Sequence, residues 1–138
     1  MTATIPGSHK NLLKDPICAA LTTVMPDGQP QTTVVWCNYD GKHVLINTMR
    51  GFRKEKNMRI NPKVTLLVFN PQNPLRYIEV RGEVQLTDEG AMEHLNELSQ
   101  LYTGKSQYFG EVVPLDLKER ETPVKGIITP KRVIIDPT

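Results

Sequence analysis

The residues best suited to chemistry in this chain form a basic stretch from Thr48 to Pro62. Its charged side chains are one acid, Glu55, and five cations within ten positions: Arg50, Arg53, Lys54, Lys56 and Arg59. The pattern indicates a short helix between two strand-like segments. The first turn of a helix exposes unpaired N–H groups, and nearby lysines add point charges, so such a segment can hold a phosphate group. The alternative is a connecting helix whose charges face water.

The sequence lacks the usual motifs of metal-dependent or nucleophilic catalysis. Cys18 and Cys37 do not have Cys-x-x-Cys spacing, and the three histidines, His9, His43 and His94, lie far apart. There is no Gly-x-Ser-x-Gly, no Gly-rich phosphate loop and no His-Glu-x-x-His. We therefore predict no metal site and leave the catalytic residues unassigned. Each histidine is expected to be exposed or hydrogen-bonded.

Composition predicts one folded domain that spans residues 1–138. The chain is 38% hydrophobic and 23% charged, as in ordinary globular proteins. Its net charge of +2 is too small for a typical nucleic-acid-binding face. Its apolar runs are far shorter than the ~20 residues of a membrane helix, and no export signal is visible at the start. We expect a cytoplasmic protein with neither a nucleic-acid nor a membrane partner.

Strand-like segments precede the basic stretch. Residues 17–25 and 30–39 are apolar or β-branched, and the turn residues between them predict a hairpin. With Asp27 and Gly28 as the central pair, the register places Cys18 opposite Cys37. We expect these two thiols to lie close together without a bond in a reducing compartment.

Further segments predict a mainly β fold. Asp40-Gly41 signals a second hairpin into a strand over 43–49, and another strand is expected over 63–69. The clearest strand, 76–87, alternates apolar and polar residues around Gly82, which indicates a bend or bulge. A helix is expected over 88–102, then a long irregular loop over 105–123 and a closing strand or strand pair over 124–135. About six antiparallel strands with two or three helices favour a small barrel.

The ordered motifs resemble a known family. Segments 28–36, 44–48, 53–58 and 61–64 look like the pyridoxamine 5'-phosphate oxidase-like split barrels. Arg76-Tyr-Ile-Glu-Val-Arg-Gly82 and Leu101-Tyr-Thr-Gly-Lys105 look more narrowly like the branch that includes deazaflavin-dependent oxidoreductases. The resemblance implies a split β-barrel homodimer. It also implies that FMN or the deazaflavin F420 binds in a groove at the subunit interface.

The resemblance also implies a set of cofactor-binding residues. Lys54 matches the phosphate-binding lysine of the family, with Arg53, Asn57 and Thr48 beside it. The strand that runs along the flavin ring is matched by Thr32, Thr33, Val34 and Val35. Tyr77 and Arg81 match positions on a strand that can approach the groove. For a cofactor enzyme, the absence of an acid–base motif is expected, because the ring carries the chemistry.

Three functions stay open at this point. The first is an oxidoreductase that uses F420 or FMN to transfer a hydride to a small organic acceptor. The second is a protein that binds or carries a flavin or a tetrapyrrole without turnover. The third is a small barrel of the oligonucleotide-binding kind, against which the low net charge and the few aromatic residues argue.

Overall fold

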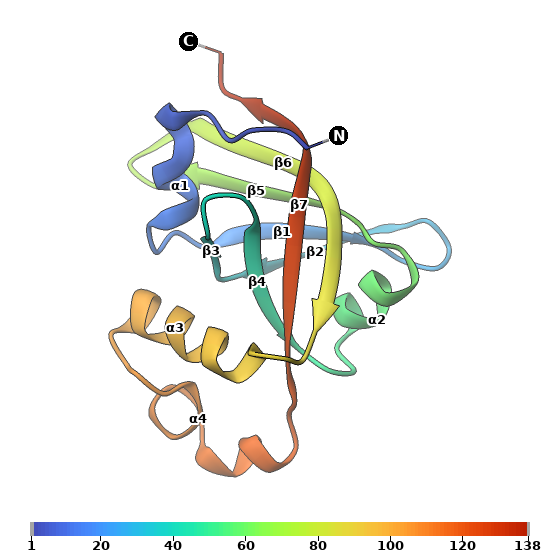
Figure 1. Ribbon diagram of the computed structural model, residues 1–138, viewed down its shortest axis with the longest axis vertical. Coiled ribbons are helices and arrows are strands. Elements are labelled where there is room, and N and C mark those ends of the chain that lie inside the picture. The colour runs from blue at the N-terminus through green and yellow to red at the C-terminus, as the bar shows by residue number, and fades with distance from the viewer. Residues whose placement is uncertain (1, 138) are drawn as a thin grey trace.

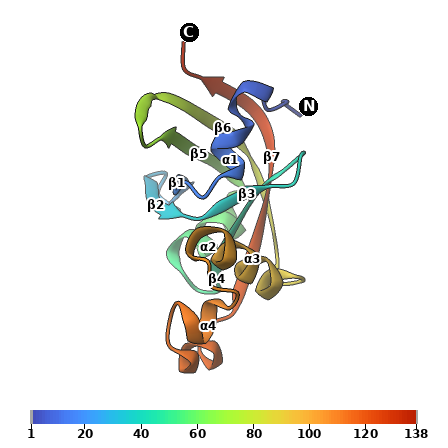
Figure 2. The ribbon, with the colours of Figure 1, turned by 90° about the vertical axis from the view of Figure 1, so that its left-hand side faces the viewer.

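Seven antiparallel strands form one curled sheet in the computed structural model, which describes residues 2–137 (Figures 1 and 2). The strands are β1 (Ala19–Val24), β2 (Pro30–Val35), β3 (Cys37–Tyr39), β4 (Val44–Met49), β5 (Lys63–Asn70), β6 (Asn73–Thr87) and β7 (Pro123–Ile135). Their order in the sheet is β2-β1-β5-β6-β7-β4-β3. The chain is therefore mainly β, as predicted, with one strand more than the six expected.

Four α-helices and two 3-10 turns accompany the sheet. They are η1 (Gly7–His9), α1 (Lys10–Lys14), α2 (Arg53–Ile60), α3 (Ala91–Thr103), α4 (Tyr108–Glu111) and η2 (Leu115–Glu119). α1 lies at one end of the sheet, whereas α3 and α4 lie toward the other (Figure 1). Among residues 2–137, no helix is both long and apolar enough to cross a lipid bilayer.

The sheet curls because its two edge strands are consecutive in the chain. We expected one strand over 30–39, but it breaks at Trp36 into β2 and β3, which stand at opposite ends of the strand order. With only one residue between them, the two edges must come close together. The result is a barrel that is open along this line, and this confirms the split-barrel prediction.

The first hairpin forms as predicted, but its register differs by one residue. Ala19 pairs with Val35, and the turn closes through Met25 N–H donating to the Gln29 carbonyl oxygen at 2.9 Å. The loop therefore has three residues, with Gly28 at a φ of +90°, instead of two. Cys37 pairs with Ile46 on the neighbouring β4, so the predicted register that places it opposite Cys18 is wrong. The two thiols still lie near each other, as expected, because Cys18 helps to raise the pKa of Cys37. Both thiols are free, as expected, but Cys18 is exposed.

Gly82 marks the predicted bulge. The register between β6 and β7 shifts there, so that Arg81 pairs with Arg132 whereas Gly82 pairs with Pro130, and Lys131 is left over. A Cβ atom at Gly82 would lie 2.4 Å from the carbonyl oxygen of Thr129. Only glycine fits where the two backbones come this close.

The main core fills the inside of the curled sheet. Its fully buried side chains include Leu21, Ile46, Leu66, Ile78 and Ile128, which come from five different strands. Each such side chain stabilises the fold by roughly 1.5–3 kcal/mol relative to an exposed one. A smaller cluster of Met49, Leu95 and Phe109 joins β4 to α3 and α4. This second cluster fixes the segment 105–123, which we expected to be irregular, beside the end of β4.

Candidate functional site

The five cations of the basic stretch have different environments. Three of them have a side-chain partner: Arg50 pairs with Asp88 at 3.3 Å, Arg53 donates to Asn57 at 3.1 Å, and Arg59 pairs with Glu55. Lys56 is exposed on the outer side of α2. Lys54 is half-buried and forms no ion pair with any residue from 2 to 137.

Glu55 fixes α2 through bonds to Gly51 and Arg59, and Lys54 is not one of its partners. Glu55 is 2% exposed, and its carboxylate accepts the Gly51 N–H at 2.8 Å. It thereby satisfies a free N–H group just before the helix and pairs with Arg59 one turn later. Burial lowers the pKa of Lys54, whose ammonium lies 5.9 Å from the centre of the Phe52 ring. An anion bound at Lys54 would offset this loss of hydration.

Lys54 lies at the edge of a cavity of about 200 Å³, which we call the Lys54 pocket. Its lining comes from β2, the β2–β3 link, β4, α2, α3, α4 and the turn before α2: Val34, Val35, Trp36, Asn47, Thr48, Met49, Phe52, Lys54, Leu95, Leu98 and Tyr108. Most of these side chains are apolar, and a few polar groups stand among them. This mixture is typical of small-molecule sites, although 200 Å³ lies below their usual range of about 300–1,000 Å³.

The aromatic wall of the pocket is fixed from behind. The Trp36 ring stacks on Tyr102 with ring centres 5.2 Å apart and meets the edge of Tyr108 at 6.0 Å. The Tyr102 hydroxyl accepts the Cys37 N–H at 3.0 Å and lies 2.9 Å from the Ile17 carbonyl oxygen. Burial raises the pKa of Tyr102. Tyr102 therefore positions Trp36 and is a poor proton donor.

Two polar atoms in the pocket wall have no partner. Asn47 Oδ1 and Thr48 Oγ1 are buried and accept or donate no hydrogen bond within residues 2–137, and the same is true of Thr33 Oγ1 on β2. Buried polar groups are nearly always paired, and an unpaired one costs about 1–3 kcal/mol. Asn47 and Thr48 line the pocket, so a ligand that reaches these two atoms with matching polar groups would satisfy them.

The pocket brings together four of the ten residues predicted to bind a cofactor, namely Val34, Val35, Thr48 and Lys54. The cavity does not include Thr32 and Thr33, although both lie on the same strand; the Thr32 hydroxyl bonds to Thr22 at 2.8 Å.

Arg53 and Asn57 also lie outside the Lys54 pocket. Asn57 is fully buried and donates to Thr23 Oγ1 at 3.0 Å, which joins α2 to β1. Arg53 is exposed and donates to Asn57 Oδ1. Within this chain both residues stabilise the helix that carries Lys54.

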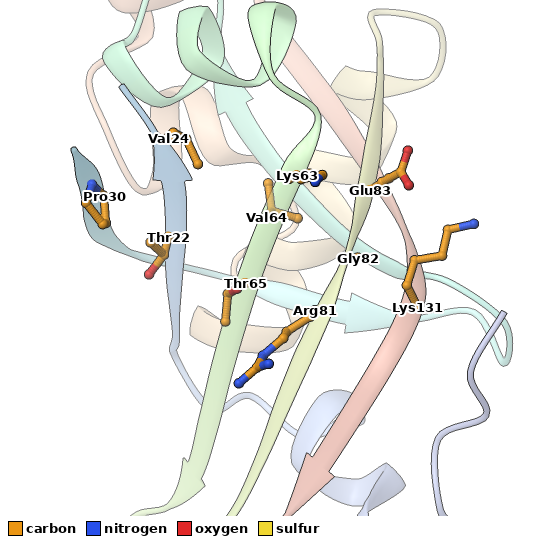
Figure 3. A pocket seen from close by; sticks show the side chains of 10 residues that line it. All are labelled: Thr22, Val24, Pro30, Lys63, Val64, Thr65, Arg81, Gly82, Glu83 and Lys131. Atoms are coloured by element: carbon orange, nitrogen blue, oxygen red, sulfur yellow. The ribbon is translucent and has the colours of Figure 1, made fainter. Parts of the chain in front are cut away.

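Tyr77 and Arg81 lie on β6, away from Lys54. Arg81 lines a second cavity of about 440 Å³, which we call the Arg81 cavity. Its lining comes from β1, β2, β5, β6 and β7: Thr22, Val24, Pro30, Lys63, Val64, Thr65, Arg81, Gly82, Glu83 and Lys131 (Figure 3). The Arg81 side chain is exposed and pairs with Glu79 at 2.5 Å. Tyr77 lines neither cavity.

Several pocket residues were missed in the sequence. Leu95 and Leu98 belong to a helix whose apolar stripe gives no signal for a site, because only the tertiary fold places them beside β4. Asn47 does carry a signal, since it is a polar residue directly after the apolar run Val44-Leu-Ile46. A polar side chain in a buried strand needs a specific partner.

Comparison with known proteins assigns the family. The sequence profile of the family described as pyridoxamine 5'-phosphate oxidase matches residues 5–133. A pyridoxine/pyridoxamine 5'-phosphate oxidase of Aeromonas hydrophila is 37% identical over 75 residues, which make up 53% of this chain and 35% of that protein. The chain thus matches about a third of the length of this relative.

Solved structures agree with this assignment. An F420 reductase is similar with a TM-score of 0.79 and 27% identity, over 94% of this chain and 98% of the other. General Stress Protein 26 of Bacillus anthracis shares the fold, with a TM-score of 0.64 and 19% identity over 93% and 91% of the two chains. The chain belongs to the pyridoxamine 5'-phosphate oxidase family of split β-barrels.

Proposed function

We propose that this protein is an oxidoreductase that binds F420 or FMN in the Lys54 pocket and serves hydride transfer to a small organic acceptor. The observation that carries the proposal is Lys54, a half-buried cation that has no counter-ion among residues 2–137 and lines a largely apolar pocket. The similarity to an F420 reductase over nearly the whole of both chains supports the same class of cofactor. Both candidate cofactors combine a flat ring with a phosphate group.

The residues of the pocket suit the two parts of such a cofactor. Lys54 would hold the phosphate group, because a desolvated ammonium gains most from an anion. Val34, Val35 and Trp36 would form the flat apolar wall for the ring, and Thr48 would bond to a polar group of the ligand. When bound, the ring supplies the hydride chemistry, and the protein orients it and keeps water out.

A second copy of the chain would complete the site. Val34 lines the pocket, yet 72% of its surface is exposed. It pairs with Ala20, which pairs with Leu67 on β5, so an apolar row runs from the pocket across the outer face of the sheet. Phe69 and Leu75, 46% and 81% exposed, extend the apolar surface. We propose that this face binds the same face of a second copy in a homodimer, since exposed apolar patches of this kind mark interfaces.

A dimer of this kind would allow two of the remaining predicted residues to contact a cofactor. Arg81 and Tyr77 lie on the strand next to β5, so within a dimer they could meet a cofactor held by the other subunit. This assignment stays a prediction, as does that of Thr32, Thr33, Arg53 and Asn57.

Cofactor titration tests the proposal. Purified protein is titrated with FMN and, separately, with F420, while the fluorescence of each ligand is recorded. We expect quenching that saturates with a Kd below roughly 100 μM for at least one of them, which corresponds to more than about 5 kcal/mol of binding free energy. Binding of a single-stranded oligonucleotide with neither cofactor bound would contradict the proposal.

Turnover separates the enzyme from the carrier. The bound cofactor is reduced under anaerobic conditions and mixed with a panel of small organic acceptors. An enzyme should reoxidise the cofactor faster with at least one acceptor than the free cofactor does in solution. Reoxidation at the solution rate with every acceptor would favour the binding or carrier function.

A further inference from the structure

Three polar side chains from three elements form a hydrogen-bonded chain behind the Lys54 pocket. Asn47 on β4 donates to His94 on α3, with 3.1 Å between Nδ2 and Nδ1. His94 Nε2 lies 2.9 Å from Oδ1 of Asn38 on β3. His94 is 2% exposed, so water does not compete for these bonds.

The direction of each bond follows from a backbone carbonyl. Asn47 Nδ2 donates to the Ala91 carbonyl oxygen at 2.9 Å, and this oxygen can only accept. The amide of Asn47 therefore cannot be reversed, and its second hydrogen points at His94 Nδ1, which must carry a lone pair. The ring proton of His94 is then on Nε2 and is donated to Asn38. Burial, together with Lys125, lowers the pKa of His94 to about 4, which keeps the ring neutral at pH 7.

This chain of bonds leaves one acceptor fixed and unused. Asn47 Oδ1 is buried and has no hydrogen-bond partner within residues 2–137, while its side chain lines the Lys54 pocket. Rotation of the amide would break the bonds to both Ala91 and His94. The pocket wall therefore contains an oxygen that can accept a hydrogen bond but cannot become a donor, and a ligand reaches this oxygen only when the side chains that cover it move.

We propose that Asn47 is a specificity-determining residue, whose Oδ1 accepts the imide N–H at the pyrimidine edge that FMN and F420 share. His94 and Asn38 are positioning residues that hold the Asn47 amide in this orientation. The inference rests on the proposed function, since it names the contact by which the same pocket recognises its cofactor. An imide N–H suits the site because it is a neutral donor in the plane of a flat ring, and the charge is already supplied by Lys54.

Methylated cofactors test this proposal. FMN, F420 and their N3-methyl derivatives are titrated into the wild-type protein and into Asn47→Ala. We expect the wild type to prefer the unmethylated form by at least about 10-fold, because the methyl group removes the donor and leaves Asn47 Oδ1 unpaired. The variant should bind both forms within about 3-fold. An unchanged preference in Asn47→Ala would overturn the proposal.

His94 is tested separately as a positioning residue. In His94→Phe the amide of Asn47 keeps only its bond to the Ala91 carbonyl oxygen and is held less firmly, so the preference for the unmethylated cofactor should fall although Asn47 itself is unchanged. In the ligand-free wild type, ¹⁵N chemical shifts should report a neutral ring with its proton on Nε2. A proton on Nδ1 at pH 7 would overturn the proposed orientation.

Failure of the inference can be told apart from failure of the proposed function. If the wild type binds neither cofactor, both fail. If a cofactor binds and Lys54→Ala weakens that binding, while the methyl preference does not depend on Asn47, only the inference fails.

Discussion

The Arg81 cavity and the Lys54 pocket differ in what their polar groups already bind. The Arg81 cavity is the larger, at about 440 Å³, but its arginine is exposed and paired with Glu79. The Lys54 pocket has about 200 Å³, yet its lysine has no ion pair within residues 2–137, and two of its buried polar atoms, on Asn47 and Thr48, have no partner there. Unsatisfied groups make a stronger case for a ligand site than volume does.

The Arg81 cavity and the Lys54 pocket also arise from different features of the fold. The Arg81 cavity adjoins the bulge at Gly82, a feature that the curvature of the sheet requires. The Lys54 pocket forms where α2, α3 and α4 pack beside β2, Trp36 and β4. The curvature of the sheet does not require polar groups at this place. We therefore expect changes near the Arg81 cavity to affect stability and changes in the Lys54 pocket to affect binding.

The largest effect should come from the exposed apolar face that runs from Val34 to Leu67. Leu67→Arg would place a charge on the apolar face twice in a symmetric dimer, so the dimer dissociation constant should rise by at least about 100-fold, or roughly 3 kcal/mol. Sedimentation velocity measures this change. Val112→Arg is a matched control, because both side chains are 37% exposed and Val112 lies at the end of α4, off the sheet. A wild-type protein that stays monomeric would contradict the proposed interface.

Acid should destabilise the wall of the Lys54 pocket. The pKa of His94 is lowered from 6.5 to about 4 in the fold, so the unfolded chain binds the proton more readily. The stabilisation is complete above about pH 6.5 and is lost as the pH falls toward 4, by about 3 kcal/mol. Denaturant unfolding of the wild type and of His94→Gln across this pH range isolates the contribution of His94 to the free energy of unfolding. Parallel pH profiles for the two proteins would argue against a buried neutral His94.

A change at the bulge should affect stability alone. Gly82→Ala places a Cβ atom 2.4 Å from the Thr129 carbonyl oxygen, so the free energy of unfolding should fall by about 1–3 kcal/mol. Gly7→Ala is the control, because a Cβ atom there has no neighbour within 4 Å. Urea denaturation compares the two variants. A Gly82→Ala protein as stable as Gly7→Ala would show that the backbones at the bulge are not held this close.

The smallest effect is expected for Arg81→Ala. Its exposed pair with Glu79 should contribute less than about 1 kcal/mol to stability. If Arg81 reaches the cofactor of the other subunit, cofactor binding should also weaken, but less than in Lys54→Ala. Urea denaturation and cofactor titration measure the two effects. A binding loss greater than that of Lys54→Ala would reverse the ranking of the two cavities.

Local signals predicted much of the fold. The Asp-Gly turns and the bulge at Gly82 each depend on one or two residues, and both features form. The register of the first hairpin could not be predicted, because it depends on whether the loop closes over two residues or three. The break at Trp36 depends on the sheet as a whole, since it occurs where one edge passes to the other.

The site was only partly predictable for the same reason. A run of five cations does not reveal which of them will find partners, because Asp88 and Asn57 become available only when the chain folds. Lys54 was identified by its resemblance to a family motif. The unpaired state of Lys54 and the bonds that fix Asn47 come from tertiary contacts.

The most direct test of the account compares two lysines on the same helix. Lys54 is half-buried in the pocket wall, whereas Lys56 is exposed on α2, so Lys54→Ala and Lys56→Ala remove the same charge from different environments. In titrations with FMN and F420, Lys54→Ala should lose about 1.5–3 kcal/mol of cofactor binding, or roughly 10- to 150-fold, and Lys56→Ala should bind like the wild type. Equal losses in the two variants, or no loss in Lys54→Ala, would contradict the assignment of the pocket.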